Sequence, residues 1–395
     1  MKRVVLAYSG GLDTSVAIRW LSDEGWDVVA VAVDVGQPDD LAATVARAET
    51  LGAVEARLED AKATYVERFV VPALHMNALY QGRYPLVSAL SRPLISKVLI
   101  DVARDTKASA VAHGCTGKGN DQVRFEASLS ALDPGIEVLA PVRDWGMSRS
   151  DSIAFAEKHE LPITTTESSP YSIDDNLWGR SIECGVLEDP WHPPPDDVWH
   201  ITRGSEQPSD EPRDCVVGFE GGAPVSVDGD TVGTERAIEA VGAIAGSYGV
   251  GRIDMIEDRL VGIKSREVYE APAAMSLIAA HSDLEALTLE RSVAAEKRKL
   301  ETTWADLVYK GLWFSPLRKA IDAFAGTTQA AVTGEVRLRF SQGVCAPAGR
   351  RSPHSLYDHS LATYGSNDSF DAGDAAGFIK LWSLPTTEWS KRKSD

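Results

Sequence analysis

The sequence predicts an α/β fold in which a doubly wound parallel sheet is followed by an α+β domain and a C-terminal tail. Residues 1 to about 165 alternate short apolar runs with segments of helical periodicity, which is the pattern of repeated βαβ units. The run 28–35 is almost continuously apolar, as expected for a strand covered on both faces. Beyond residues 164–166 the alternation is lost, and strand pairs and helices follow in separate groups. The predicted domains are therefore 1–165, 166–360 and 361–395.

The expected elements of the first domain follow in chain order. Strands are predicted at 3–8, 28–35, 54–58, 108–113 and 137–142. Helices are predicted at 14–24, 41–51, 61–79, 94–106 and 148–159. Pro72 predicts a kink or break in the third helix, and Ser148 with Asp151 predicts a capping box at the last one. Ligands bind at the carboxyl ends of such strands, so the chemistry is expected after the first, second and fourth strands.

The second domain is expected to combine hairpins with helices. A Gly-Gly link joins predicted strands 215–220 and 223–227, and a two-residue turn joins 335–340 to 343–347. Helices are predicted at 238–247, 274–281, 284–309 and 317–328. The tail carries Phe378, Leu381 and Trp382 in a segment with few internal partners. We predict that the tail packs on a neighbouring subunit, although packing on its own domain fits the same pattern.

Composition excludes several classes of protein. The formal net charge of −18 argues against a protein that holds long nucleic acid by general attraction to phosphate. The four cysteines form no C-x-x-C pair and the eight histidines no H-E-x-x-H motif, so neither a protein-held metal nor a disulfide framework is expected. No apolar run reaches the roughly 18 residues that would span a bilayer, and the chain begins as a strand without a signal peptide. We expect a cytoplasmic protein.

The opening strand leads into a small polar turn and then a helix. An apolar run that begins at Val4 breaks at Gly10 and Gly11 before helical periodicity starts. This geometry points free backbone N–H groups and the positive helix end at an anion, and the glycines allow close approach. The Lys of a Walker A loop is missing, and Ser9 stands where a dinucleotide fingerprint needs its first glycine. We interpret the turn as a phosphate-binding loop; an ordinary strand-to-helix turn that needs glycines is the alternative.

Residues 9–14 read Ser-Gly-Gly-Leu-Asp-Thr, which resembles the signature of the N-type ATP pyrophosphatases. The resemblance implies that the first domain binds ATP, that the loop holds the β- and γ-phosphates, and that ATP is cleaved to AMP and pyrophosphate. Asp13 is expected either to contact a metal ion carried by the nucleotide or to be the N-cap of the helix.

A second group of polar residues follows the fourth predicted strand. Residues 113–126 hold three glycines and then a cluster of polar and charged side chains. A flexible surface loop is the alternative, but the position beside the phosphate-binding loop favours a binding site. Together with the segments 83–93, 172–181 and 249–270, this stretch resembles the argininosuccinate synthase family, and the similarity extends to about residue 375.

This resemblance implies an AMP-forming carbon–nitrogen ligase of arginine biosynthesis. The ureido oxygen of citrulline would attack the α-phosphorus of ATP, releasing pyrophosphate and leaving a citrullyl-adenylate. The amine of aspartate would then displace AMP and give argininosuccinate. ATP would be a substrate with Mg²⁺ carried on the nucleotide, and a homotetramer is implied. Because the adenylate forms on the substrate, no protein nucleophile is needed, and catalysis would consist of alignment and charge stabilisation.

The resemblance also assigns residues to the three substrates. The ATP-binding positions are Ala7, Tyr8, Ser9, Gly10, Gly11, Leu12, Asp13, Thr14, Ser15, Val33 and Gly114. The aspartate-binding positions are Thr116, Asn120 and Asp121. The citrulline-binding positions are Tyr84, Asn120, Arg124, Ser172, Ser181, Glu257 and Tyr269. Asp121 is also the candidate catalytic residue, as acceptor of a proton from the attacking ammonium group. Ala89 stands where some family members have a serine contact, and neither Ala89 nor the neighbouring Ser88 is assigned.

Two other classes of protein compete with this interpretation. A tRNA-thiolating enzyme or an amidotransferase of the same superfamily would share the first loop, but the acidic balance and the absence of paired cysteines weigh against thiolation. Lys2 follows Met1, where an N-terminal glutaminase would need a cysteine. A nucleotide sensor without turnover would be expected to lack the polar residues of 113–126, which are present here.

Overall fold

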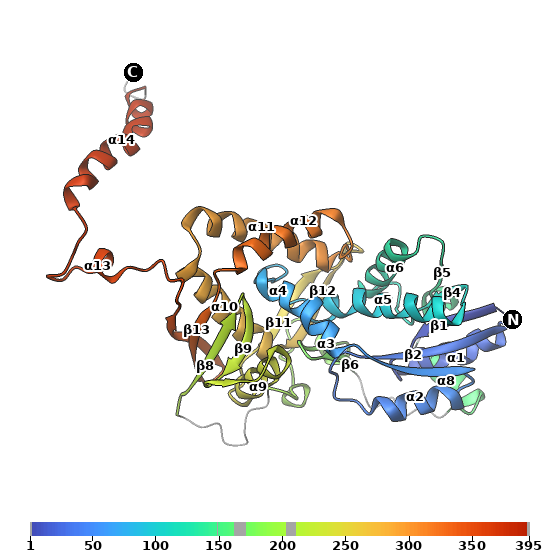
Figure 1. Cartoon of the computed structure of the whole chain (residues 1–395). Helices are drawn as coiled ribbons and strands as arrows, with labels where there is room; N and C mark the ends of the chain where they lie inside the picture. Colours follow the sequence, from blue (N-terminus) through green and yellow to red (C-terminus); the bar gives the residue numbers. More distant parts are fainter. Residues whose placement is uncertain (1, 148, 162–170, 203–210, 393–395) are drawn as a thin grey trace. The chain divides into compact units, whose positions relative to one another are not determined.

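A computed structural model describes residues 2–147, 149–161, 171–202 and 211–392 of the chain. It separates into two units, Met1–His354 and Ser355–Asp395, each described here by itself (Figure 1). Ser148 of the predicted capping box and the composition change at 164–166 lie outside the described residues. The predicted domain boundaries at 165 and 360 remain predictions.

The first unit begins with a parallel sheet whose strands lie in the order β3-β2-β1-β4-β5. The strands are β1 (Lys2–Ala7), β2 (Trp26–Asp34), β3 (Glu55–Asp60), β4 (Ala110–Ala112) and β5 (Glu137–Leu139). Val4 and Leu6 of β1 pack in one apolar cluster, whereas Val5 between them packs in another, because successive side chains of a strand point to opposite faces. Both faces of the central strand are therefore buried.

Helices cover both faces of this sheet. They are α1 (Leu12–Asp23), α2 (Leu41–Thr50), α5 (Val87–Thr106), α6 (Asp121–Leu132), α7 (Pro141–Trp145) and α8 (Arg149–Lys158). Figure 1 shows α5 and α6 on one side of the strands and α1, α2 and α8 on the other. Crossovers of this kind on both faces confirm the doubly wound sheet predicted from the sequence.

Two helix predictions in this region differ from the structure. The segment predicted as one helix at 61–79 is α3 (Lys62–Tyr65), a π-helical stretch (Val66–Val70) and α4 (Val71–His75). Pro72 does not break the helix. It lies in the first turn of α4, where the missing N–H of a proline is tolerated. Helix α5 begins at Val87 rather than at 94 and includes Pro93, since burial of its apolar residues offsets the lost hydrogen bond.

Two antiparallel sheets complete the first unit. One has the order β10-β9-β8-β13-β14 and the other β11-β12-β7-β6. The strands are β6 (Ser172–Asn176), β7 (Gly179–Glu183), β8 (Arg213–Glu220), β9 (Ala223–Val227), β10 (Asp230–Thr231), β11 (Arg252–Asp258), β12 (Lys264–Glu270), β13 (Gly334–Ser341) and β14 (Val344–Arg351). Both predicted hairpins are confirmed as β8–β9 and β13–β14. The structure also contains the hairpins β6–β7 and β11–β12, for which no strands were predicted from the sequence.

Helices pack against these sheets and against one another. They are α9 (Thr234–Ser247), α10 (Pro272–Thr288), α11 (Arg291–Tyr309) and α12 (Pro316–Gln329), with 3₁₀ turns at Gly185–Glu188 and Asp196–Val198. The helix predicted at 284–309 is wrong at its start, because α10 ends at Thr288 and α11 begins separately. The Glu290 carboxylate accepts hydrogen bonds from Ser292 N at 2.8 Å and Val293 N at 3.2 Å, which caps the new helix.

The second unit contains α13 (His359–Ala362) and α14 (Ala372–Lys391). The side chains of Phe378, Leu381 and Trp382 on α14 are 60%, 72% and 71% exposed. Their rings and methyl groups form an apolar surface on the helix, and contact with another subunit remains a prediction for it. Among the described residues, no helix is long and apolar enough to cross a membrane.

Candidate active site

The loop between β1 and α1 forms the first wall of the site. Gly10 has a φ of +77°, a left-handed conformation that glycine adopts without strain, and Gly11 occupies the N-cap position of α1. The hydroxyl oxygens of Ser9 and Thr14 lie 3.2 Å apart across the turn. The first backbone N–H groups of α1 therefore lie beside the hydroxyl groups of Ser9 and Thr14, as expected for an anion-binding loop.

Asp13 lies in the first turn of α1 and lines the cavity. The interpretation of Asp13 as the helix N-cap is wrong, because Gly11 takes that position. The other interpretation, a contact to a metal ion carried by the nucleotide, remains a prediction. Within the described residues, no group of three or more His, Cys, Asp or Glu side chains is placed to hold a metal ion.

The loop after β4 touches the loop after β1. A Cβ atom added to Gly114 would lie 2.6 Å from Cγ2 of Thr14, a distance that van der Waals repulsion forbids. The close approach brings residues 114–121 beside the phosphate-binding loop, as predicted from the position of both loops at the carboxyl edge of the parallel sheet.

These loops surround one cavity of about 470 Å³. The ATP-binding positions that line it are Ala7, Tyr8, Ser9, Gly11, Asp13, Thr14, Val33 and Gly114. The aspartate- and citrulline-binding positions that line it are Tyr84, Thr116, Asn120, Asp121, Arg124, Ser172, Ser181, Glu257 and Tyr269. Gly10, Leu12 and Ser15 do not line it; the Ser15 hydroxyl lies 3.4 Å from the Tyr8 hydroxyl inside the protein.

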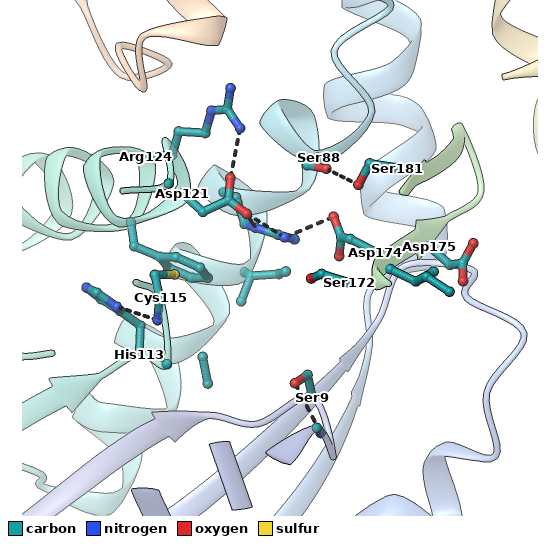
Figure 2. Close-up of a pocket in the computed structure, with 18 of the residues that line it drawn as sticks. Ser9, Ser88, His113, Cys115, Asp121, Arg124, Ser172, Asp174, Asp175 and Ser181 are labelled. Carbon is teal, nitrogen blue, oxygen red and sulfur yellow. Dashed lines mark hydrogen bonds and ion pairs between the residues drawn. The ribbon is translucent and has the colours of Figure 1, made fainter. Parts of the chain in front are cut away.

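Asp121 is held between two arginines at the start of α6. Its Oδ1 lies 2.8 Å from Arg124 Nη1 (Figure 2), and its Oδ2 lies 2.7 Å from Arg92 Nη2. Burial by itself would raise the pKa of Asp121, but the charges of Arg92 and Arg124 outweigh it and lower the pKa to about 2. The carboxylate stays ionised at neutral pH.

Strands β11 and β12 supply a second carboxylate. Both oxygens of Glu257 accept phenol hydrogen bonds, Oε1 from Tyr269 and Oε2 from Tyr309, the latter at 2.8 Å. Burial raises the pKa of Glu257, and the two phenols act in the opposite direction. The ring of Tyr84 stacks on that of Tyr269 with centroids 4.4 Å apart. Glu257 is thus fixed in the wall of the cavity.

The hairpin β6–β7 brings its polar side chains against α5. Ser181 Oγ lies 3.2 Å from Ser88 Oγ, and both residues line the cavity (Figure 2). Ala89 is buried and does not line it. Ser88 therefore supplies a hydroxyl group to this wall, next to the position where some family members have a serine in place of Ala89.

Arg259 connects the carboxylates of Glu183 and Glu267 to the loop after β4. Its Nη2 lies 2.6 Å from Glu183 Oε2 and 2.6 Å from Glu267 Oε1, and its Nη1 donates to the Lys118 carbonyl at 3.4 Å. Burial and the neighbouring Glu267 raise the pKa of Glu183. No role was predicted for Arg259, Glu183 or Glu267, although all three line the cavity.

Residues distant in sequence complete the site. Arg92 lies within the segment 83–93 that resembles the family but was given no role. No sequence motif identified Tyr309, which lies at the end of a helix far along the chain. Only the packing of α11 against α6 shows that Tyr309 contacts Asn120 and Arg124.

Comparisons with known proteins match the chain over nearly its full length. The model of the arginosuccinate synthase N-terminal HUP domain matches residues 3–162, and that of the arginosuccinate synthase C-terminal domain matches residues 171–389. The argininosuccinate synthase of Halalkalibacterium halodurans is 55% identical over 98% of this chain and 95% of its own. That of Bacillus licheniformis is 55% identical over 98% and 96%, and that of Synechococcus sp. is 53% identical over 99% and 97%. The chain therefore belongs to the argininosuccinate synthase family.

Proposed function

We propose that this cavity joins citrulline to aspartate in two steps, with ATP cleaved to AMP and pyrophosphate and argininosuccinate as the product. One observation supports the proposal above all: residues assigned to ATP, aspartate and citrulline line the same cavity. The ureido oxygen must reach the α-phosphorus and the aspartate amine must then reach the ureido carbon, so the reaction requires such a shared space. The product would serve arginine biosynthesis.

The phosphate end of ATP would lie against the loop between β1 and α1. Backbone N–H groups of α1 and the hydroxyls of Ser9 and Thr14 would bind the β- and γ-phosphates, and Val33 and Gly114 would border the nucleotide. Mg²⁺ carried on ATP would neutralise part of the charge of the leaving pyrophosphate. The oxygen donors of Ser9, Asp13 and Thr14 along this wall are of the type that Mg²⁺ prefers.

Citrulline would lie between α6 and β11. Arg124 would bind its carboxylate, because Asp121 and the Tyr309 carbonyl use only two of the five N–H donors of the guanidinium group. Glu257 would bind its ammonium group, with Tyr84, Ser172, Ser181 and Tyr269 around the rest of the molecule. The positive charge of Arg124 and the carboxylate of Glu257 are complementary to the α-carboxylate and the α-ammonium group of an amino acid.

Aspartate would lie beside the loop after β4. Thr116 and Asn120 would bind its carboxylates, and Asp121 would bind its ammonium group. A carboxylate with a pKa of about 2 is a weak base, so Asp121 is better suited to binding than to accepting the proton. Alignment of the two amino acids with ATP can supply roughly 7–11 kcal/mol of the barrier reduction.

Citrulline-dependent exchange of pyrophosphate into ATP tests the first step. The purified protein with ATP, Mg²⁺, labelled pyrophosphate and citrulline, but without aspartate, should form labelled ATP. Exchange that does not depend on citrulline would support another ATP pyrophosphatase, and no exchange at all would support a sensor. Release of ADP and orthophosphate with all substrates present would contradict the proposal outright.

We further propose that the chain works as a cytoplasmic homotetramer, with α14 in contact between subunits. The exposed apolar side chains of Phe378, Leu381 and Trp382 support the contact. The proposed boundaries are those predicted from the sequence, an ATP-binding domain at 1–165, a synthetase domain at 166–360 and a tail at 361–395. Sedimentation of the purified chain tests the number of subunits.

A further inference from the structure

We propose that Tyr309 is a positioning residue that holds the aspartate- and citrulline-binding side chains in a single arrangement. The inference rests on the proposed function, because it takes Asn120, Arg124 and Glu257 as substrate-binding groups. Tyr309 is the last residue of α11, is fully buried and does not line the cavity. It acts through its contacts with Asn120, Arg124 and Glu257.

The phenol group of Tyr309 orients Asn120 and Glu257 at the same time. Asn120 Nδ2 donates to the phenol oxygen at 2.8 Å, and the phenol donates to Glu257 Oε2 at 2.8 Å. Leu260 N donates to Asn120 Oδ1 at 2.9 Å, so a reversed amide would lose this hydrogen bond and would compete with Glu257 for the phenol proton. The hydrogen bonds run in one direction, from Asn120 through Tyr309 to Glu257.

The main chain and the ring of Tyr309 hold Arg124. Arg124 Nε donates to the Tyr309 carbonyl at 3.0 Å, and the guanidinium carbon lies 4.9 Å from the ring centroid. Gly311, with a φ of +74°, follows the helix, and a Cβ atom added there would lie 2.9 Å from Arg124 Cα. A glycine at this position therefore lets the end of α11 approach α6 closely enough for these contacts.

Two further aromatic rings fix the plane of the Tyr309 ring. Tyr80 stacks on it with centroids 3.5 Å apart and planes 7° apart, and Tyr84 meets it edge-on at 6.2 Å and 85°. The phenol oxygen is therefore held in place before any substrate arrives. Such preorganisation strengthens binding, because less freedom is lost when the amino acids enter.

Tyr309→Phe removes the phenol oxygen but keeps the ring and the main-chain carbonyl. A lost hydrogen bond to a charged group corresponds to a rise in KM of roughly ten- to hundred-fold. We expect such a rise for citrulline and for aspartate and an unchanged KM for ATP, because the phosphate-binding loop does not touch Tyr309. The pKa of Glu257 should also rise, since the Tyr309 hydrogen bond lowers it, and the acidic limb of kcat/KM for citrulline should move to higher pH.

Tyr80→Phe is the matched control. It removes the phenol hydroxyl of the ring stacked on Tyr309, which donates to the Asp258 carbonyl at 2.9 Å, and it leaves the hydrogen bonds that join Tyr309 to Asn120 and Glu257 in place. All KM values should stay unchanged in this variant. A double variant, Tyr309→Phe with Asn120→Ala, should raise KM for aspartate no further than Asn120→Ala alone, because Tyr309 acts on aspartate through Asn120.

Unchanged KM values for both amino acids in Tyr309→Phe would overturn the inference. So would a variant in which only the amount of active protein and the melting temperature fall, since that indicates a structural role alone. Wild-type protein that shows no citrulline-dependent pyrophosphate exchange would instead contradict the proposed function, so the two failures are distinguished by the wild-type measurement.

Discussion

Arg92 Nη2 lies 2.7 Å from Asp121 Oδ2 and 2.9 Å from Asp174 Oδ2, so one guanidinium group joins two carboxylates of the cavity wall. Arg92 belongs to α5, Asp121 to α6 and Asp174 to β6. The ion pairs therefore connect helices α5 and α6 to the hairpin that carries Ser172 and Ser181. This connection fixes the distance between the two groups of residues that we assign to the amino acid substrates.

Replacement of Arg92 should destabilise the protein far more than replacement of an exposed arginine. Arg92→Met leaves Asp121 and Asp174 without their shared cation in a mostly buried position, which costs about 3 kcal/mol or more. Arg19→Met is the matched control, because the Arg19–Asp23 pair is exposed and such pairs contribute about 0–1 kcal/mol. Urea unfolding of both variants measures the difference, and equal losses would contradict a structural role of the Arg92 pairs.

Asp121→Asn should impair the step that uses aspartate and leave the first step intact. Because the amide keeps the shape but loses the charge that binds the ammonium group, KM for aspartate should rise at least roughly tenfold. Citrulline-dependent pyrophosphate exchange should be preserved, since aspartate takes no part in the first step. If exchange falls as strongly as overall turnover, the assignment of Asp121 to aspartate is incorrect.

The same carboxylate should make stability depend on pH in acid. Its pKa is lowered from 3.8 to about 2 in the folded chain, so the ionised form stabilises the fold above the unfolded pKa. This contribution, about 2 kcal/mol, is complete at neutral pH and is lost as the pH falls from about 4 towards 2. The difference in unfolding free energy between wild type and Asp121→Asn should shrink over that range; a constant difference between pH 5 and pH 3 would argue against the two ion pairs.

A methyl group at position 114 should weaken ATP binding. In Gly114→Ala the new Cβ would lie 2.6 Å from Thr14 Cγ2 and would push the phosphate-binding loop away, at a cost of about 1–3 kcal/mol. We expect KM for ATP to rise roughly five- to hundred-fold. Gly117→Ala is the control, because its Cβ would lie 3.5 Å from Arg143 Cγ and 3.9 Å from Arg143 Cδ, which are ordinary van der Waals contacts.

Adding Thr14→Ser to Gly114→Ala provides a rescue. Serine keeps the hydroxyl that lines the cavity and lacks the Cγ2 atom responsible for the clash. KM for ATP should return most of the way to the wild-type value in the double variant. If it stays as high as in Gly114→Ala alone, the contact between the two loops is not the cause.

The tail prediction can be tested without touching the cavity. Phe378→Glu with Trp382→Glu places two charges on the apolar surface of α14, which should weaken subunit contacts and give a smaller species in sedimentation. Trp191→Glu is the matched control, because Trp191 is 92% exposed and lies in the first unit. Sedimentation of the tail variant at the wild-type rate would exclude α14 from the contact.

Local spacing was sufficient to predict the first two loops of the site. The run at residues 9–14 and the run at 113–126 each combine glycines with polar groups directly after a strand, and both line the cavity. The hairpins β6–β7 and β11–β12 were missed because one face of each borders the cavity. Residues such as Ser181, Glu183 and Tyr269 are polar where a core-facing strand would be apolar, so the alternation that identifies a strand is weak.

By itself, the sequence determined the parallel sheet, the glycine-containing turn between β1 and α1 and the membership of a ligase family, because these depend on short-range patterns and on motifs read along the chain. Tertiary structure alone decided which charged and polar groups meet: Arg92 with Asp121, Arg259 with Glu183, and Tyr309 with Asn120. The partners in these pairs come from different elements. A hydrogen bond or an ion pair depends on distance in space, which spacing along the chain does not specify.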